Sequence, residues 1–447
     1  MAVRPAATIT GAGLMNATLT KPSVAEKRPN RLRRFLAQFG PGLIWAMVAI
    51  GQTHVILSTY AGARFGFSLL WVIMLAHLFT YPVFEYGPRY AVATGDSLLG
   101  AYMQFRRMRM FMMVFFGMLL LTIPFLGVAS LLSVSASVLF AAFPQLSFNA
   151  WCVIITVATA ALIFAGRYKG LEITCIAMSG VLVVTTLLAF FLRFPQPQEF
   201  LAGGLLPAIP AGSLVTLVAL IRMPTDPATS IMHSVWAVKK RDEWIRGDGL
   251  QAGLRKSLLD LRVGFVFSLM IAFIFLSLGA TVLRPRGISL EGVDVAIKLS
   301  RIYTESVGAW TFPLFIGVAF IALWGSYYTN ADGVPRMFES LYNSAKKKNQ
   351  TAELSPLRMV YTAMLMGGGL LLAVLAQRPV FLVILAVSAG LIAYPMIYLM
   401  NIYAVTKLVP PEFRPSRLNL ALACCGVAYS LVGVTLLLLV RVFGLWN

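Results

Sequence analysis

The chain has 447 residues, of which 59% are hydrophobic and 12% charged, and its mean hydropathy is +0.80. A water-soluble chain of this length could not bury so much apolar surface, which excludes a soluble enzyme, a disordered protein and a secreted disulfide-linked domain. The 37 Lys and Arg outnumber the 17 Asp and Glu, but they lie in short loops between apolar runs. This pattern argues against nucleic acid as a partner and indicates a polytopic protein of the lipid bilayer.

The polar, basic residues 1–36 predict a flexible cytoplasmic tail, and residues 37–447 predict a single transmembrane domain. Eleven apolar runs follow the tail, and each approaches the roughly 20 residues that a helix needs to cross a bilayer. They lie at 40–62, 67–93, 110–141, 148–166, 172–192, 213–237, 263–283, 308–332, 358–376, 380–404 and 418–440.

The basic residues also predict an orientation. With the tail placed inside, the inner segments carry 26 Lys and Arg and the outer ones carry 8. Because cytoplasmic loops are enriched in Lys and Arg, we expect a protein of the cell membrane with its N-terminus in the cytoplasm and its C-terminus outside. The first five and the next five spans then have opposite orientations, as an inverted repeat requires.

Two runs differ from ordinary membrane helices. The first contains a polar GQTH sequence at mid-membrane, and the sixth contains Pro224, Asp226 and Pro227 at the same depth. Proline interrupts a helix, and broken backbone is tolerated in a membrane where it lines a cavity or packs on protein. Two broken spans, five apart, predict a central substrate site, the alternative being two proline kinks without a ligand.

The chain resembles the natural resistance-associated macrophage protein (Nramp) family of divalent-metal transporters. GPG…GQTH…AGARFGFSLLW is similar to the first two spans of that family, GRYKGLE to its turn between spans four and five, and LLPAIPAGSLVTLVALI…MHS to its span six. The resemblance implies an all-α, leucine-transporter-like fold of two inverted five-helix repeats, at about 38–192 and 205–404. An eleventh span at 418–440 completes it, and the substrate is expected between broken spans one and six.

The departures from the family are as informative as the matches. Its metal-binding D-P-G-N is replaced by Gly51-Gln52-Thr53-His54, and Asp226, Pro227 and Ala228 stand where the family has Met-Pro-His. Residues 110–166 contain no Asp, Glu, Lys, Arg or His, although span three carries acids in the metal transporters. We therefore expect no metal ligands in the family's positions.

In each broken span, hydrogen-bond donors lie at the start of the helical half that follows the break. These donors suit a small oxyanion, because helix N-termini carry partial positive charge. This reasoning favours bicarbonate, although nitrate or formate satisfy it equally. The alternative is a divalent-metal transporter of the Nramp type, for Mn²⁺, Fe²⁺ or Mg²⁺, with unusual ligands. The expected substrate-binding residues are Gly51, Gln52, Thr53, His54, Asp226, Pro227, Ala228, Thr229 and Ser230.

A Na⁺ or H⁺ gradient is expected to drive transport, with Na⁺ as the one candidate cofactor. Candidate coupling or gating residues are Asp226, His233, Ser326 and Thr329. Asp226 is equally suited to capping the second half of span six. No nucleophile–base pair or phosphate loop indicates an enzyme, and a monomer is compatible with the sequence.

Two further polar positions favour structural roles. Glu85 and Arg89 lie four residues apart on the second apolar run, so they are expected to form a buried ion pair. His77, on the same run, is expected to be a packing residue.

Overall fold

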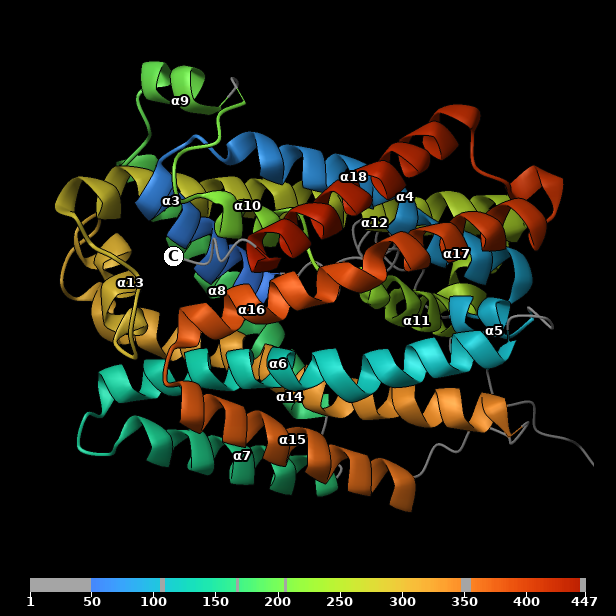
Figure 1. Cartoon of the computed structure of the whole chain (residues 1–447), viewed down its shortest axis with the longest axis horizontal. Helices are drawn as coiled ribbons and strands as arrows, with labels where there is room; N and C mark the ends of the chain where they lie inside the picture. Colours follow the sequence, from blue (N-terminus) through green and yellow to red (C-terminus); the bar gives the residue numbers. More distant parts are fainter. Residues whose placement is uncertain (1–49, 105–108, 166–168, 205–206, 347–354, 443–447) are drawn as a thin grey trace, which may run out of the picture. The chain divides into compact units, whose positions relative to one another are not determined.

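All regular elements in the described part of the chain are helices, and they follow the apolar runs of the sequence (Figure 1). The computed structural model describes residues 50–104, 109–165, 169–204, 207–346 and 355–442. These belong to the unit Gln38–Asn447. The predicted tail at 1–36 and the first ten residues of the first apolar run lie outside the described residues.

The first apolar run ends in a π-helical segment that continues directly into a short α-helix. The elements of this half of the chain are η1 (Ile50–Ser58), α3 (Thr59–Phe65), α4 (Leu70–Thr94), α5 (Leu98–Met103), α6 (Arg109–Ala142), α7 (Phe148–Phe164), α8 (Lys169–Leu192) and α9 (Pro197–Gly204). Local sequence sets several of these boundaries. Gly95 takes a positive φ of 78° where α4 ends, and Ser147 caps α7 by accepting a hydrogen bond from the Ala150 amide.

The sixth apolar run is divided between two helices, as its prolines predict. The second half of the chain contains α10 (Leu214–Leu220), α11 (Ala228–Ile245), α12 (Gly249–Leu278), η2 (Gly279–Leu283), η3 (Arg284–Arg286), α13 (Val295–Thr304), α14 (Thr311–Ala345), α15 (Pro356–Ala376), α16 (Pro379–Gly390), η4 (Leu391–Ala393), α17 (Tyr394–Lys407), η5 (Pro411–Phe413) and α18 (Arg417–Val442).

Six segments among the described residues are each long and apolar enough to cross a membrane unaided. They are Met110–Ala142, Gly249–Arg286, Thr311–Asn343, Pro356–Ala376, Pro379–Lys407 and Arg417–Val440. The chain is a multi-pass membrane protein. That it crosses the bilayer eleven times stays a prediction.

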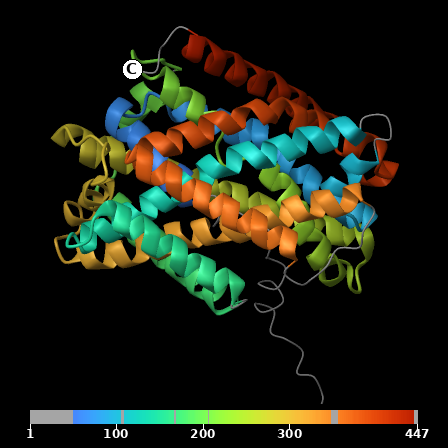
Figure 2. The ribbon, with the colours of Figure 1, turned by 60° about the horizontal axis from the view of Figure 1, so that its bottom comes forward.

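Two long helices organise the packing. Helix α6 contacts α14, α15 and α16, whereas α4 contacts α11, α12 and α18. Helices α7 and α15 lie side by side in both views (Figures 1 and 2). The broken segment η1 contacts α10, α12, α14 and α16, so the polar GQTH residues are enclosed by helices that are distant in sequence.

The predicted ion pair between Glu85 and Arg89 is present, with both side chains almost completely buried. Arg89 also donates a hydrogen bond to the Phe413 carbonyl at 2.8 Å, and the Asn419 amide donates to Glu85 at 3.1 Å. The pair therefore ties α4 to η5 and α18, which supports the expected structural role.

Candidate functional site

The break in span one lies at Gly51, whose backbone is non-helical (φ −51°, ψ −119°) inside η1. A Cβ placed on Gly51 would lie only 2.7 Å from the Ser326 hydroxyl oxygen of α14. Glycine thus allows the broken backbone to press against α14, which a larger residue could not do without displacing Ser326.

The break in span six lies between the end of α10 at Leu220 and the start of α11 at Ala228. Four consecutive carbonyls in this break, at 222–225, accept hydrogen bonds from hydroxyl groups of three other elements. Thr53 donates to Pro224 at 3.0 Å, Thr80 to Met223 at 3.3 Å, and Tyr394 to Arg222 and Thr225 at 3.0 and 3.1 Å. The Thr53 bond joins the two breaks directly.

A cavity of about 140 Å³ lies where the breaks meet α6, α14 and α16. Since one water molecule occupies roughly 30 Å³ in the liquid, it has room for a small hydrated solute. Seven of the predicted residues line it: Gln52, Thr53, Asp226, Ala228, Thr229, Ser326 and Thr329. Arg222, Thr225, Asn330 and two methionines, Met232 and Met337, line it as well.

Arg222 and Asp226 form an ion pair at the wall of this cavity. The guanidinium donates to the Asp226 carboxylate at 2.5 Å, and the two side chains are 12% and 18% exposed. Arg222 also donates to the Ala386 and Val387 carbonyls of α16, at 2.7 and 3.1 Å. The pair neutralises the carboxylate and attaches the break to α16.

Asp226 also caps α11, as the sequence suggested. Its second carboxylate oxygen accepts a hydrogen bond from the Ala228 amide at 2.9 Å, and its carbonyl accepts one from the Thr229 hydroxyl at 2.5 Å. The start of α11 therefore already faces a carboxylate of its own chain.

Several predicted site residues lie behind the cavity wall. His54 is completely buried, and its ring nitrogens contact Thr53 and Ser268. Ser230 is buried and lies 3.1 Å from the Asn401 side-chain amide, which donates to it. His233 is buried in α11, and Pro227 immediately precedes that helix.

Sequence reasoning missed three contributors to the site. Tyr394 holds two carbonyls of the span-six break, Ser130 donates to the Gln52 side-chain oxygen at 2.6 Å, and Ser268 contacts His54 at 2.8 Å. A serine in an apolar run was the available signal for Ser130 and Ser268, but hydroxyls that bond to their own helix give the same signal.

The hydroxyls of the predicted coupling residues Ser326 and Thr329 bond to their own helix. Their hydroxyls donate to the Ala322 and Gly325 carbonyls of α14, at 3.1 and 2.8 Å. Their role in holding Na⁺ stays a prediction.

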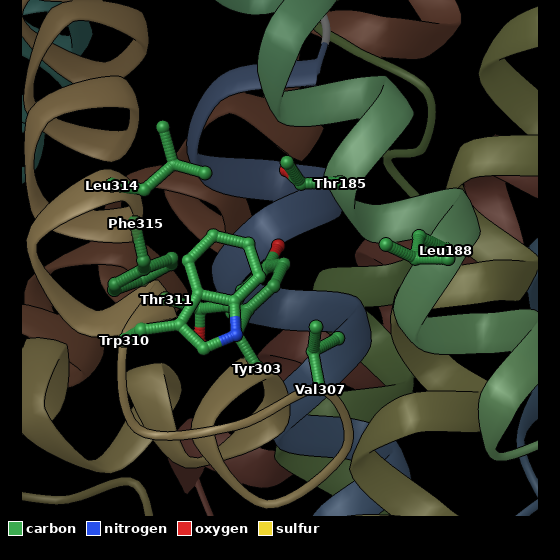
Figure 3. Close-up of a pocket in the computed structure, with 8 residues that line it drawn as sticks. All are labelled: Thr185, Leu188, Tyr303, Val307, Trp310, Thr311, Leu314 and Phe315. Carbon is green, nitrogen blue, oxygen red and sulfur yellow. The ribbon is translucent and has the colours of Figure 1, made fainter.

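A second pocket, between α8, α13 and α14, is much smaller (Figure 3). Its volume is about 20 Å³, and it is lined mainly by apolar side chains such as Leu188, Trp310 and Phe315. It shares no lining residue with the larger cavity. The larger cavity is the better candidate for a substrate site because of its volume and its charged lining residues.

Metal-ligating side chains do not cluster in the described ranges: no three His, Cys, Asp or Glu residues come close enough together to hold an ion. Of the residues that line the 140 Å³ cavity, Asp226 is the single carboxylate. A metal ion held there would therefore have to keep part of its hydration shell.

Solved structures of membrane transporters share this architecture. A manganese transporter of Eremococcus coleocola, crystallised with an aromatic bis-isothiourea compound, superimposes with a TM-score of 0.67 at 12% identity, over 92% of this chain and 87% of that one. Mhp1, a nucleobase-cation-symport-1 family transporter, superimposes in its closed conformation with a TM-score of 0.58 at 13% identity, over 92% and 94% of the two chains. The fold is that of the leucine-transporter-like membrane transporters.

The sequence profile of the natural resistance-associated macrophage protein-like family matches residues 42–441. The chain belongs to this family, as the sequence motifs indicated, and it is a transporter rather than an enzyme.

Similar sequences have been found in bacteria and plants. An uncharacterized protein of Pasteurella multocida is 26% identical over 92% of this chain and 94% of its own length. The divalent metal cation transporter MntH of Chromohalobacter salexigens is 25% identical over 56% of this chain, and the metal transporter Nramp5 of Oryza sativa subsp. japonica is 22% identical over 65%. These two matches span 58% and 54% of the metal transporters.

The expectation of a bicarbonate transporter is wrong. The family match and the relatives named as metal transporters point to a metal cation instead. The structure supplies a physical reason, because several of the donors needed by an anion are already engaged. Thr53 and Thr229 donate to carbonyls of the break, and the Ala228 amide at the start of α11 donates to the Asp226 carboxylate.

Proposed function

We propose that this chain is a secondary transporter that carries a hard divalent metal cation, such as Mg²⁺ or Mn²⁺, through the cavity between the two broken spans. The observation that carries the proposal is the Asp226 carboxylate, which faces this cavity in a chain of the Nramp family. The ion gradient that drives transport is one of H⁺ or Na⁺.

The chemistry of the cavity favours a partly hydrated ion. Asp226 provides one negative charge, and Thr229, Ser326 and Asn330 add oxygen atoms around the same space. Oxygen ligands suit Mg²⁺ and Mn²⁺, and Mg²⁺ in particular retains water molecules when it binds to proteins. The volume of about 140 Å³ leaves room for that water.

Arg222 has to release Asp226 for the cation to bind. The guanidinium and the metal ion compete for the same carboxylate, and Arg222 can stay bonded to the Ala386 and Val387 carbonyls after it leaves. Binding therefore exchanges one positive partner of Asp226 for another, so the carboxylate is never left unpaired.

Uptake of Mg²⁺, Mn²⁺ and Zn²⁺ into proteoliposomes that contain the full chain tests the proposal. We expect saturable Mg²⁺ or Mn²⁺ uptake, which Asp226→Asn should abolish. Asp332→Asn is the matched control, because Asp332 forms an i,i+4 pair with Arg336 on α14 outside the cavity lining. Folded protein that moves none of these ions, or an Asp226→Asn variant that transports like the parent, would overturn the proposal.

The proposed setting is a cell membrane, with the N-terminus in the cytoplasm and the C-terminus outside. The 26-to-8 distribution of Lys and Arg supports this orientation. A C-terminal tag that is labelled by membrane-impermeant reagents on intact cells would agree with it, whereas labelling only after permeabilisation would contradict it.

A further inference from the structure

The tenth apolar run of the chain holds the span-six break from behind the cavity wall. Its two helices, α16 and α17, are joined by η4 (Figure 1). Tyr394, the first residue of α17, donates from its hydroxyl to the Arg222 carbonyl at 3.0 Å and to the Thr225 carbonyl at 3.1 Å. A hydroxyl has a single proton, so the two carbonyls share it. The hydroxyl therefore ties together two peptide groups that lie three residues apart.

These two peptide groups belong to the ion pair that lines the cavity. The first carbonyl is that of Arg222 itself, and the second belongs to the peptide bond between Thr225 and Asp226. The Arg222 guanidinium also donates to the Ala386 and Val387 carbonyls of α16, at 2.7 and 3.1 Å. The α16–α17 segment thus holds Arg222 by both its backbone and its side chain, and it holds the peptide group that precedes Asp226.

Tyr394 is buried and does not line the cavity. Tyr398, one turn further along α17, stacks on it with ring centroids 6.1 Å apart and donates to the Thr80 hydroxyl at 3.1 Å. The Thr80 hydroxyl in turn donates to the Met223 carbonyl at 3.3 Å. Successive turns of α17 therefore fix the break, and Tyr394 acts on the site through the backbone rather than as a ligand.

The two carboxylate oxygens of Asp226 have different partners. The oxygen Oδ1 accepts a hydrogen bond from the Ala228 amide at 2.9 Å, and Oδ2 accepts one from the Arg222 guanidinium at 2.5 Å. When the guanidinium gives way to a cation, Oδ2 becomes available while Oδ1 stays on the amide. The cation then meets one carboxylate oxygen.

A single carboxylate oxygen suits Mg²⁺ better than Ca²⁺. Mg²⁺ requires near-octahedral geometry and keeps several of its water molecules, whereas Ca²⁺ takes about six to eight oxygen ligands and accepts bidentate carboxylates. A carboxylate that was free to turn could offer both oxygens to the larger ion. Selectivity between the two ions therefore depends on how firmly the backbone at Asp226 is held against the start of α11.

We propose that Tyr394 is a positioning residue that keeps one Asp226 oxygen on the Ala228 amide, so that the cavity selects Mg²⁺ over Ca²⁺. This inference rests on the proposed function, because the cation that binds is the one transported. The hydroxyl matters most in the loaded cavity, where Arg222 no longer holds the carboxylate. Without Tyr394 the break would have to be ordered each time a cation binds, and the advantage of a preorganised site would be lost.

Hydrogen–deuterium exchange of the full chain in nanodiscs, without added metal, tests the positioning itself. The amides at 228–230, in the first turn of α11, report on the break because they bond to Asp226 and Pro227. In Tyr394→Phe these amides should exchange about three- to tenfold faster than in the parent, since one hydrogen bond that holds the break is lost.

Tyr303→Phe is the matched control. Tyr303 is likewise buried, and its hydroxyl lies 2.7 Å from the Thr186 hydroxyl, beside the small pocket of Figure 3 and outside the lining of the larger cavity. Both variants lose one buried hydroxyl, so a similar loss of stability is expected. Exchange at 228–230 should stay as in the parent. A folded Tyr394→Phe variant that exchanges like this control overturns the positioning role.

Isothermal titration of Mg²⁺ and Ca²⁺ into the same samples measures selectivity as the ratio of the two dissociation constants. The parent should bind Mg²⁺ more tightly. Tyr394→Phe should lower this preference roughly three- to tenfold, the size expected from the loss of one hydrogen bond, and Tyr303→Phe should keep it. A merely structural role would lower the stability of both variants alike and leave the ratio unchanged. An unchanged ratio in Tyr394→Phe overturns the role in selectivity.

Asp226→Glu tests the same geometry with Tyr394 intact. The added methylene moves the carboxylate away from the Ala228 amide, so both oxygens can reach the cation. The preference for Mg²⁺ should fall in this variant as well. A parent-like ratio in Asp226→Glu would overturn the explanation based on one available oxygen.

The outcomes separate this inference from the proposed function. A parent that binds and transports no divalent cation would overturn the proposed function, and the exchange rates would still decide whether Tyr394 positions the break. Normal Mg²⁺ uptake together with equal affinity for Mg²⁺ and Ca²⁺ would overturn the selectivity alone.

Discussion

Replacing Arg222 with Gln should make the cavity bind divalent cations more tightly. In the present structure, the guanidinium holds the Asp226 carboxylate at 2.5 Å, and both side chains are mostly buried. An arriving cation has to displace it. Gln removes the positive charge and can still donate a hydrogen bond toward the α16 carbonyls.

The size of the effect follows from the bond that is removed. A hydrogen bond to a charged group contributes about 1.5–3 kcal/mol. The cation no longer has to break this bond in the variant, so its dissociation constant should fall roughly ten- to a hundredfold. Because tighter binding acts mainly through slower dissociation, the maximal rate of uptake should fall as well.

Isothermal titration of Mg²⁺ into the full chain in nanodiscs measures the affinity, and proteoliposome uptake measures the rate. Arg336→Gln is the control, since Arg336 forms the same i,i+4 pair with Asp332, at 2.8 Å, but is exposed and does not line the cavity. It should leave both quantities unchanged. Equal or weaker binding by folded Arg222→Gln would refute the competition between guanidinium and cation.

Two further substitutions test the packing at the span-one break and the buried ion pair of α4. Gly51→Ala places a Cβ 2.7 Å from the Ser326 hydroxyl oxygen, so it should lower the thermal unfolding midpoint and slow uptake. Adding Ser326→Ala removes that oxygen and should restore part of both quantities. A double variant that restores neither would contradict the contact. Glu85→Gln leaves the buried Arg89 without its carboxylate and should destabilise the fold by about 3–5 kcal/mol. The thermal unfolding midpoint should fall by a large amount. A variant as stable as the parent would disprove this prediction.

The helical architecture was accessible from the sequence because it depends on two strong signals. Apolar runs of membrane length located the helices, and Pro224 and Pro227 located the break between α10 and α11. The ends of α12 and α14 were not found. Helix α12 begins at Gly249 and α14 continues to Ala345, both through polar residues that hydropathy assigns to loops.

The contents of the cavity were only partly accessible. Asp226 and Thr53 could be placed there because they lie at breaks, but their bonding could not be predicted, since it involves partners far along the chain. Arg222 could equally have pointed to lipid headgroups, and only the carbonyls of Ala386 and Val387 on α16 fix its direction. The bicarbonate interpretation failed for this reason, because it counted donors without knowing which acceptors they already had.

The Arg222–Asp226 pair also bears on how the transporter would return empty. A carrier has to reset after unloading, and a bare carboxylate crossing a medium of low dielectric constant is strongly disfavoured. Arg222 is a counter-ion fixed to the protein that pairs with Asp226 again once the cation has left, so the reset step moves no net charge from this pair. Under the proposed function, the membrane voltage would then act on the loaded step alone, and net uptake would not require a second cation to be carried back.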